Sequence, residues 1–454
     1  MRSDNPSDQV FRTIDNRRAE IIELGERIYR HPEAGFKEFD TARLVAERLR
    51  GLGLACIELT DIPGVKATVD TGKDGPGVAI IGEMDAILCP DHPDSSKETG
   101  AVHACGHHAQ IAAMFGAAVG LLDASVLRRL AGKIHFLAVP AEECIEIAYR
   151  NELRAKGVIR YMGGKPELLH RGLFDGVDLC MMVHVIVHAD LMAEKKVVFE
   201  PTANGCLAKK IRYIGRAAHA GASPHEGINA LYAANLGMAA INSLRETFRE
   251  KEFVRVHPII TKGGDVVNVI PSEVCLETFV RGKTMDDILR ANKKINRALI
   301  GGAIAMGAKV EIEDIPGYYP LTMNPDLVTL TKDVVAALLS EDEVDDLEHM
   351  TGSTDLGDLS ALMPVIQPYI GGCTGVLHSV DFRVSDPETA YILAAKILAG
   401  TAVKLLAGNA AAARDILARF KPVFKSKMEY FSFIDGLFRK KTYPEGDIGD
   451  GVDL

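Results

Sequence analysis

The sequence has 454 residues, of which 47% are hydrophobic and 25% are charged, and its formal net charge is −10. This composition is typical of a folded globular protein, and the length indicates two or three domains. An acidic chain argues against nucleic acid or an anionic membrane as a partner. The polar N-terminal stretch predicts no secretory signal, and we find no apolar run of the roughly 18 residues that span a bilayer. We therefore expect a cytoplasmic protein.

The eight cysteines are scattered singly along the chain, without a CxxC pair. In a chain of this length, that spacing does not predict a disulfide framework, and most of the thiols are expected to be reduced and buried. Cys105 stands apart because histidines surround it.

The first 200 residues alternate between helical and strand-like patterns, which predicts an α/β domain with a mainly parallel sheet and helices on both of its faces. Helical periodicity covers 8–31, 39–52 and 109–122. Short apolar runs typical of buried parallel strands cover 77–86, 133–143 and 178–185.

The pattern changes after residue 199. Strand-like and helical runs follow in the order β-α-β-β-α-β, with helices predicted over 229–248 and 284–307, and this order indicates a ferredoxin-like insert over residues 200–315. A strand over 363–372 and a long buried helix over 387–408 then resume the α/β pattern. We thus predict a discontinuous catalytic domain, residues 1–199 and 316–454, interrupted by a lid domain.

Ionisable residues follow the predicted parallel strands where each strand ends. Asp85 ends one strand, Glu142 and Glu143 end the next, and His184 ends the third. Ligands of such sheets bind beyond the carboxyl ends of the strands, and burying an unpaired charge is costly. The sequence therefore predicts a functional site at this edge, although Asp85 alone could also cap a turn.

The octet "HACGHHAQ", residues 103–110, places three histidines and one cysteine within six residues. Cys105 and His107 are suitable ligands for zinc or a similar ion. The octet by itself fits a capped polar loop with one buried thiol equally well.

The adjacent acids Glu142 and Glu143 can divide two tasks, because neighbouring side chains point in different directions. One carboxylate can bind a metal while the other takes a proton from water. Alternatively, both begin a helix, where the dipole favours acids. His184 and His378, in "GVLHS", are each either ligands or hydrogen-bonded core residues.

Taken together, the motifs resemble those of the dinuclear-metal amidohydrolases of metallopeptidase family M20. This family includes aminoacylases, carboxypeptidases, auxin-conjugate hydrolases and p-aminobenzoyl-glutamate hydrolases. The resemblance covers roughly residues 15–408, and only the joint occurrence of the motifs is specific. The motifs, in chain order, are "GEMDA", "HACGHH", "PAEE", "VH" at 183–184, "AAHAGASPHEGINAL", "VVNVIPSE", "FVRG" and "GVLHS".

The resemblance implies two divalent metal ions, zinc or manganese, per subunit. Their ligands would be Cys105, His107, Glu143, His184 and His378, with Cys105 a candidate to bridge the two ions. Glu142 would be the general base and later the general acid for a metal-bridging water that attacks the scissile amide. Asp85 would orient a ligand histidine.

The resemblance also implies roles for residues outside the metal site. His219 would reach the active site of a partner subunit, which implies a homodimer formed through the lid domain, or it could simply pack against its small neighbours. Asn268 would contact substrate across that interface or form a turn. Arg281 would bind a substrate carboxylate, because a guanidinium does so with two hydrogen bonds, or would pair with an acid of the lid. Gly371 and Gly372 would bring backbone N–H groups close to substrate or form a turn.

Two positions depart from the family pattern. His108 stands where an acid or amide is common, so it is either an extra ligand or a replacement that weakens the site. Cys144 stands where a glycine is usual, which affects the substrate pocket. The motif "GSTDLGDLSALMP" (352–364) is closer to the p-aminobenzoyl-glutamate branch.

These observations predict a metal-dependent amidohydrolase that acts on an N-acyl or N-aroyl amino acid resembling p-aminobenzoyl-glutamate. A dipeptidase or carboxypeptidase is the first alternative. The second is a binding homologue that has lost catalysis.

Overall fold

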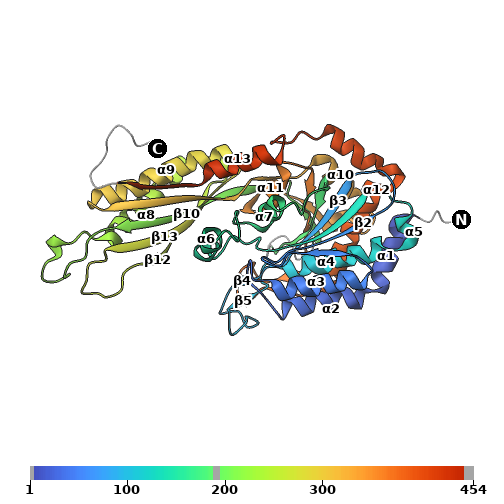
Figure 1. The fold of residues 1–454 in the computed structure, drawn as a ribbon, viewed down its shortest axis with the longest axis horizontal. Helices are drawn as coiled ribbons and strands as arrows, with labels where there is room; N and C mark the ends of the chain where they lie inside the picture. The colour runs from blue at the N-terminus through green and yellow to red at the C-terminus, as the bar shows by residue number, and fades with distance from the viewer. Residues whose placement is uncertain (1–4, 188–194, 444–454) are drawn as a thin grey trace. The chain divides into compact units, whose positions relative to one another are not determined.

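The computed structural model describes residues 5–187 and 195–443. These residues form two compact units, each of which is built from separate stretches of chain (Figure 1). Unit 1 contains the described residues of 1–202, 322–349 and 358–423, and unit 2 contains those of 203–321, 350–357 and 424–454.

Unit 1 is built on a six-stranded sheet in which four neighbouring strands are parallel and two edge strands are antiparallel. The parallel part confirms the predicted α/β class. The strand order is β1 (Cys56–Glu58), β2 (Val65–Asp70), β6 (Lys133–Val139), β3 (Gly77–Glu83), β7 (Leu179–Met181) and β18 (Val365–Ile366).

A second sheet of unit 1 has four short strands, and two small ribbons complete the β-structure. The sheet order is β16 (Val344–Asp346), β9 (Val197–Phe199), β19 (Tyr369–Ile370) and β8 (His184–Val185). The ribbons pair β4 (Ile87–Leu88) with β5 (Ala101–Val102), and β20 (Cys373–Thr374) with β21 (Arg383–Val384).

Helices cover both faces of the six-stranded sheet. On one face α4 packs against β3 because Gly82 leaves room for Ile111, and α1, α2 and α3 lie on the same side (Figure 1). On the other face the loop after α7 is hydrogen-bonded to the sheet from Gly176 O to His135 Nε2 (3.0 Å). The helices of unit 1, with α11 at its border, are α1 (Pro6–Asn16), α2 (Arg18–Tyr29), α3 (Phe39–Gly51), α4 (His107–Leu121), α5 (Ala124–Leu127), α6 (Ile147–Ala155), α7 (Gly164–His170), α10 (Pro325–Val335), α11 (Leu356–Ser360), η4 (Glu341–Glu343), η5 (Glu388–Leu393) and α12 (Ala394–Arg419).

Three sequence-based elements differ from the structure. The single helix predicted over 8–31 is two helices, because the backbone leaves the helical region at Arg17 (φ −114°). The single strand predicted over 363–372 is β18 and β19, which lie in different sheets, because Pro368 has no N–H to donate to a ladder. The predicted strand 178–185 divides in the same way into β7 and β8.

The expectation that no segment could span a membrane by length and apolarity was wrong. The helix from Glu388 to Arg419 meets both criteria, and 78% of its apolar window is buried within the protein. Such burial is typical of a core helix, and α12 packs against α1, α4 and α10.

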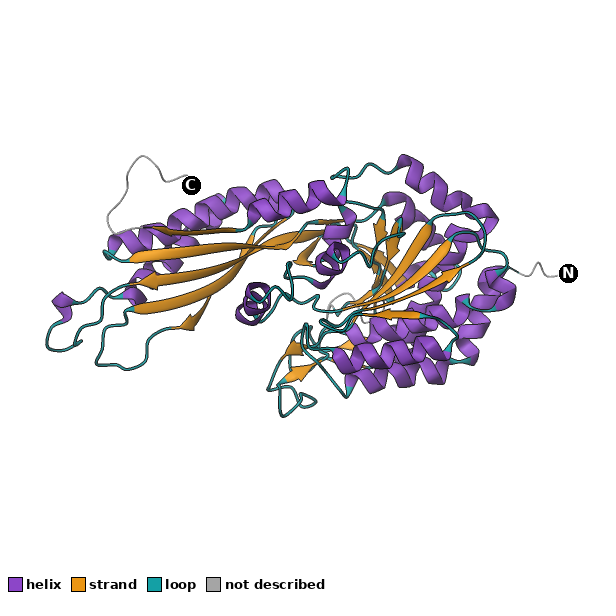
Figure 2. Cartoon of the chain, viewed as in Figure 1, coloured by secondary structure: helices purple, strands orange, loops and turns teal. Residues whose placement is uncertain are grey.

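Unit 2 has the predicted β-α-β-β-α-β order, with helices along one face of an antiparallel sheet (Figure 2). Residues of β13 alternate between half-buried and buried, and the buried set, from Val274 to Val280, packs under the helices. The strands are β10 (Thr202–Ile214), β11 (Arg255–Val256), β12 (Ile259–Lys262), β13 (Glu273–Gly282), β14 (Lys309–Tyr318), β15 (Leu321–Thr322), β17 (Met350–Ser353) and β22 (Arg439–Tyr443). The helices are η1 (Pro224–Glu226), α8 (Ala230–Ser243), η2 (Arg245–Thr247), η3 (Glu250–Glu252), α9 (Met285–Ala305) and α13 (Lys427–Leu437).

The C-terminal segment adds an element that the sequence pattern did not reveal. Strand β22 pairs antiparallel with β14 and thus extends the sheet of unit 2, whereas we had included these residues in the catalytic domain. "RKKTY" is a polar edge strand, and such strands lack the apolar alternation by which strands are predicted.

Candidate metal centre

The octet lies where a short ribbon strand leads into the buried helix α4. Cys105 is buried, and His107 is the first residue of α4. Gly106 between them has φ +82°, and a Cβ at this position would overlap Val185 Cγ2. Glycine is therefore required for the chain to turn here, and the turn projects Cys105 and His107 into the same space.

Asp85 orients two of the predicted ligands. Its Oδ1 lies 3.0 Å from His107 Nδ1, and its Oδ2 accepts a hydrogen bond from the backbone N–H of Glu143 (2.8 Å). His107 Nδ1 is thereby occupied, so Nε2 is the nitrogen that remains for a metal. Among the described residues, Nε2 has no hydrogen-bond partner although it is fully buried.

The two glutamates follow β6 after a strained residue. Ala141 has φ +53°, and its N–H donates to the buried carboxylate of Glu38 (2.7 Å). Left-handed backbone at a residue other than glycine is costly and is typical of functional sites. Beyond it, Glu142 places Oε2 3.9 Å from His107 Nε2.

Two groups of three side chains share Cys105. The first is Cys105, His107 and His184, and the second is Cys105, Glu143 and His378; in each group the ligand atoms lie within 4.8 Å of one another. The Sγ atom lies 3.6 Å from His184 Nε2 and 3.2 Å from His378 Nε2. A sulfur and a nitrogen on one tetrahedral zinc ion are about 3.5 Å apart, so both spacings are near those of a metal site.

The electrostatics of the site favour charged ligands. Burial raises the pKa of the Cys105 thiol and Glu143 adds to the rise, but three imidazoles outweigh both and lower that pKa to about 6. Burial lowers the pKa of the half-exposed His378, yet Glu143 and Cys105 raise it to about 11. Burial also opposes ionisation of Glu143, whereas His378, 2.9 Å away, holds the pKa of that carboxyl well below its usual range.

The ligand set fits the ions that the sequence resemblance implies. A thiolate, three imidazoles and a carboxylate are donors for divalent borderline metals, and the orphaned His107 Nε2 is aimed among them. These ligands come from segments nearly 300 residues apart, and the fold brings them to one sheet edge.

Sequence reasoning missed Glu83, the last residue of β3. It forms a third group with His107 and Glu142. The signal was present in "GEMDA", where acids two residues apart follow one strand and point to the same side.

The two departures from the family pattern lie outside the ligand groups found among the described residues. His108 packs among aromatic rings, with Tyr29 at 5.0 Å, His103 at 5.3 Å and Tyr391 at 5.9 Å between centroids. Burial, assisted by the neighbouring histidines, holds the pKa of His108 well below its usual range. Cys144 is buried.

In unit 2, the structure brings His219 and Asn268 onto adjacent backbone segments. His219 pairs with Val269 in a β-bridge, and Ala220 N–H donates to Asn268 O (2.9 Å). His219 is exposed, and its Nδ1 accepts hydrogen bonds from the N–H groups of Gly221 (3.1 Å) and Ala222 (3.0 Å). Nε2 of the neutral ring is therefore a hydrogen-bond donor.

Arg281 lies on β13, with its guanidinium 5.3 Å from the Phe279 ring and 3.3 Å from Ser353 Oγ. No carboxylate of the described chain forms an ion pair with it. The alternative of an Arg–acid pair in the lid is thus absent from the described contacts.

The two glycines of unit 1 are engaged in backbone structure. Gly371 N–H donates to Lys196 O (2.9 Å), so this group is not offered to a ligand. Gly372 has φ +90°, and its carbonyl accepts from Ser385 and Asp386, which is the geometry of a turn.

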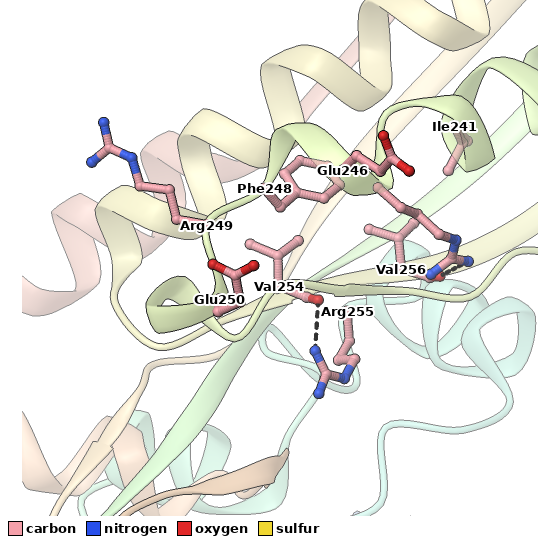
Figure 3. A pocket seen from close by; sticks show the side chains of 9 residues that line it. Ile241, Glu246, Phe248, Arg249, Glu250, Val254, Arg255 and Val256 are labelled. Atoms are coloured by element: carbon pink, nitrogen blue, oxygen red, sulfur yellow. Dashed lines mark hydrogen bonds between the residues drawn. The ribbon is translucent and has the colours of Figure 1, made fainter.

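A separate pocket of unit 2 contains none of the predicted site residues. Figure 3 shows it between the end of α8, the following turns and β11, with Arg255 donating to Val254 O (3.1 Å). It is lined by Ile241, Arg245, Glu246, Phe248, Arg249, Glu250, Val254, Arg255 and Val256.

A mainly parallel sheet whose strand ends gather a thiolate, imidazoles and carboxylates defines a metal-dependent hydrolase. The chain belongs to Peptidase family M20/M25/M40, whose family model matches residues 79–404. Members of this family are metal-dependent hydrolases of amide and peptide bonds, so the expectation of an enzyme is confirmed.

Curated relatives cover most of the chain. Thermostable carboxypeptidase 2 of Saccharolobus solfataricus is 28% identical over 81% of this chain and 91% of its own. Xaa-Arg dipeptidase of Mus musculus is 31% identical over 72% of this chain and 71% of its own. A p-aminobenzoyl-glutamate hydrolase polypeptide of Escherichia coli is 24% identical over 87% of this chain and 92% of its own.

Solved structures share the fold. A dinuclear metal-binding peptidase of this family from Bacillus subtilis has a TM-score of 0.63 at 23% identity, covering 86% of this chain and 98% of its own. An aminobenzoyl-glutamate utilization protein from Klebsiella pneumoniae has a TM-score of 0.63 at 20% identity, covering 87% and 98%.

Proposed function

We propose that the protein hydrolyses the amide bond between an acyl or aroyl group and an amino acid, with p-aminobenzoyl-glutamate as the model substrate. The observation that carries the proposal is the pair of ligand groups sharing Cys105, with Glu142 beside them. Similarity to the Escherichia coli p-aminobenzoyl-glutamate hydrolase supports the substrate class.

Two divalent ions, zinc or manganese, would be held by this site. Cys105, His107 and His184 would bind one, and Cys105, Glu143 and His378 the other. When bound, the ions would supply Lewis acidity and lower the pKa of a water between them. The thiolate favours zinc, while the carboxylate admits manganese.

The chain's own residues would move the proton. Glu142 would take a proton from the attacking water and deliver it to the leaving amine nitrogen, the two tasks of a general base and acid. Asp85 would hold His107 in the tautomer that leaves Nε2 free. His219 would donate from Nε2 to the developing oxyanion, and its backbone-fixed Nδ1 supports that assignment.

Substrate recognition would come from unit 2, the proposed lid domain. Arg281 would bind the carboxylate of the leaving amino acid with two hydrogen bonds, and the absence of a described acidic partner supports this role. Asn268 would contact the substrate beside His219. In this scheme His219 and Asn268 act on a partner subunit's site, so we propose a homodimer, and we place the enzyme in the cytoplasm.

A dipeptidase or carboxypeptidase is the second candidate. Two of the relatives carry those names, and substrates of both kinds share a terminal carboxylate with N-acyl amino acids. The candidates differ in the group on the acyl side of the bond.

A substrate panel tests the proposal. Purified protein loaded with zinc or manganese is assayed on p-aminobenzoyl-glutamate, N-acetyl amino acids and dipeptides. Preference for the aroyl or acyl compounds, by kcat/KM, is expected. A preference for dipeptides would select the second candidate, and a protein that binds two ions but cleaves nothing would refute both.

A further inference from the structure

Glu83 is a buried carboxylate to which the mechanism above gives no task. It lies at the end of β3, and both Glu83 and Lys165, its ion-pair partner, have fully buried side chains. Glu83 Oε2 also accepts a hydrogen bond from Gln110 Nε2 (2.6 Å), while Glu83 N–H donates to Gln110 Oε1 (3.2 Å). Taking two charges out of water is expensive, and an apolar pair often stabilises a fold as well or better. This arrangement is therefore poorly explained by stability alone.

The network aims one carboxylate oxygen at the nitrogen that is free to bind metal. Lys165 holds Oε1, and Oε2 lies 3.3 Å from His107 Nε2. Two ligands bound about 2.1 Å from one tetrahedral ion are about 3.4 Å apart. The observed spacing is thus that of two atoms that share a cation.

Glu142 lies within the same group. The ligand atoms of Glu83, His107 and Glu142 are all within 4.8 Å of one another, and His107 Nε2 is buried without a hydrogen-bond partner among the described residues.

We infer that Glu83 is an additional carboxylate ligand of the ion on His107, and that Lys165 is the counter-charge that fixes its geometry. The inference rests on the proposed two-ion site and adds a residue to it. Lys165 and Gln110 are positioning residues, since they act on the ion only through Glu83.

Two variants test this inference through metal binding rather than activity. Glu83→Gln removes the charge of the carboxylate but leaves Lys165 buried without its ionic partner, which threatens folding. The double variant Glu83→Gln/Lys165→Met removes both charges and relieves that penalty. Metal-free proteins are titrated with Co²⁺, and uptake is followed by visible absorption and elemental analysis, with circular dichroism to verify folding.

Unit 2 offers a matched control. Lys209 and Asp314 form an equally buried ion pair beneath α9, with Lys209 Nζ also 2.6 Å from Asn296 Oδ1, and no histidine belongs to this network. The variant Asp314→Asn/Lys209→Met should bind Co²⁺ as the wild type does.

For the double variant at Glu83 and Lys165, we expect one of the two ions to bind at least 10-fold more weakly, with an altered Co²⁺ spectrum. A folded double variant with wild-type affinity and spectrum would overturn the inference and leave the two-ion site intact. A wild-type protein that takes up no Co²⁺ would instead overturn the two-ion site, and the inference with it.

Discussion

The substitution Gly106→Ala tests whether the turn between Cys105 and His107 is set against the strand that carries His184. The added methyl group would overlap Val185 Cγ2 and would have to adopt φ near +82°. Left-handed backbone costs an L-residue roughly 1–2 kcal/mol, and overpacking a core costs roughly 1–3 kcal/mol. We therefore expect Gly106→Ala to destabilise the metal-free protein by about 2–5 kcal/mol.

The two costs can be separated with a second substitution. Val185→Ala removes two carbons from a side chain that is 3% exposed and should alone cost about 1.6 kcal/mol plus a cavity term. In the double variant, the overlap disappears while the backbone strain stays. The double variant should therefore be about 1–3 kcal/mol more stable than the sum of the single effects predicts.

The assay is urea denaturation followed by circular dichroism, with Zn²⁺ affinity measured by chelator competition. Weaker Zn²⁺ binding in Gly106→Ala should recover in part in the double variant. If the two stability effects add within about 0.5 kcal/mol, the residues do not interact, and the proposed reason for Gly106 is wrong.

Three further outcomes follow from the site. Glu142→Gln should keep both metal ions and lose about 10²–10⁴-fold in kcat; undiminished turnover would remove Glu142 as the base. In metal-free protein, the Cys105 thiolate should appear near pH 6 in the 240 nm absorbance difference from Cys105→Ser, because the imidazoles lower its pKa; a transition near pH 9 would contradict that electrostatic account. His219→Ala should lower kcat by about 10²–10³-fold with metal content unchanged, and active mixed dimers of His219→Ala with Glu142→Gln are expected only if His219 acts across the subunit interface.

The fold class and the edge of the sheet that carries the site could be predicted because both depend on local patterns. Apolar runs that end in Asp85, Glu142 and His184 revealed buried strands and the polar groups beyond them. The order of elements between residues 200 and 315 likewise reproduced the arrangement of unit 2.

The remaining features depend on contacts between distant residues. Lys165 begins a short helix and has no apolar or motif context, so its burial against Glu83 could not be anticipated. Strand β22 forms only because β14 offers an edge more than 120 residues earlier in the chain. The division of the predicted strand at Pro368 follows from the ladder with β8, which the local pattern does not specify.

Metal reconstitution tests the central claim most directly. Protein stripped by a chelator should not hydrolyse any amide substrate of the panel, and titration with Zn²⁺ or Mn²⁺ should restore turnover that saturates at two ions per chain. Turnover that persists in fully metal-stripped protein would contradict the account.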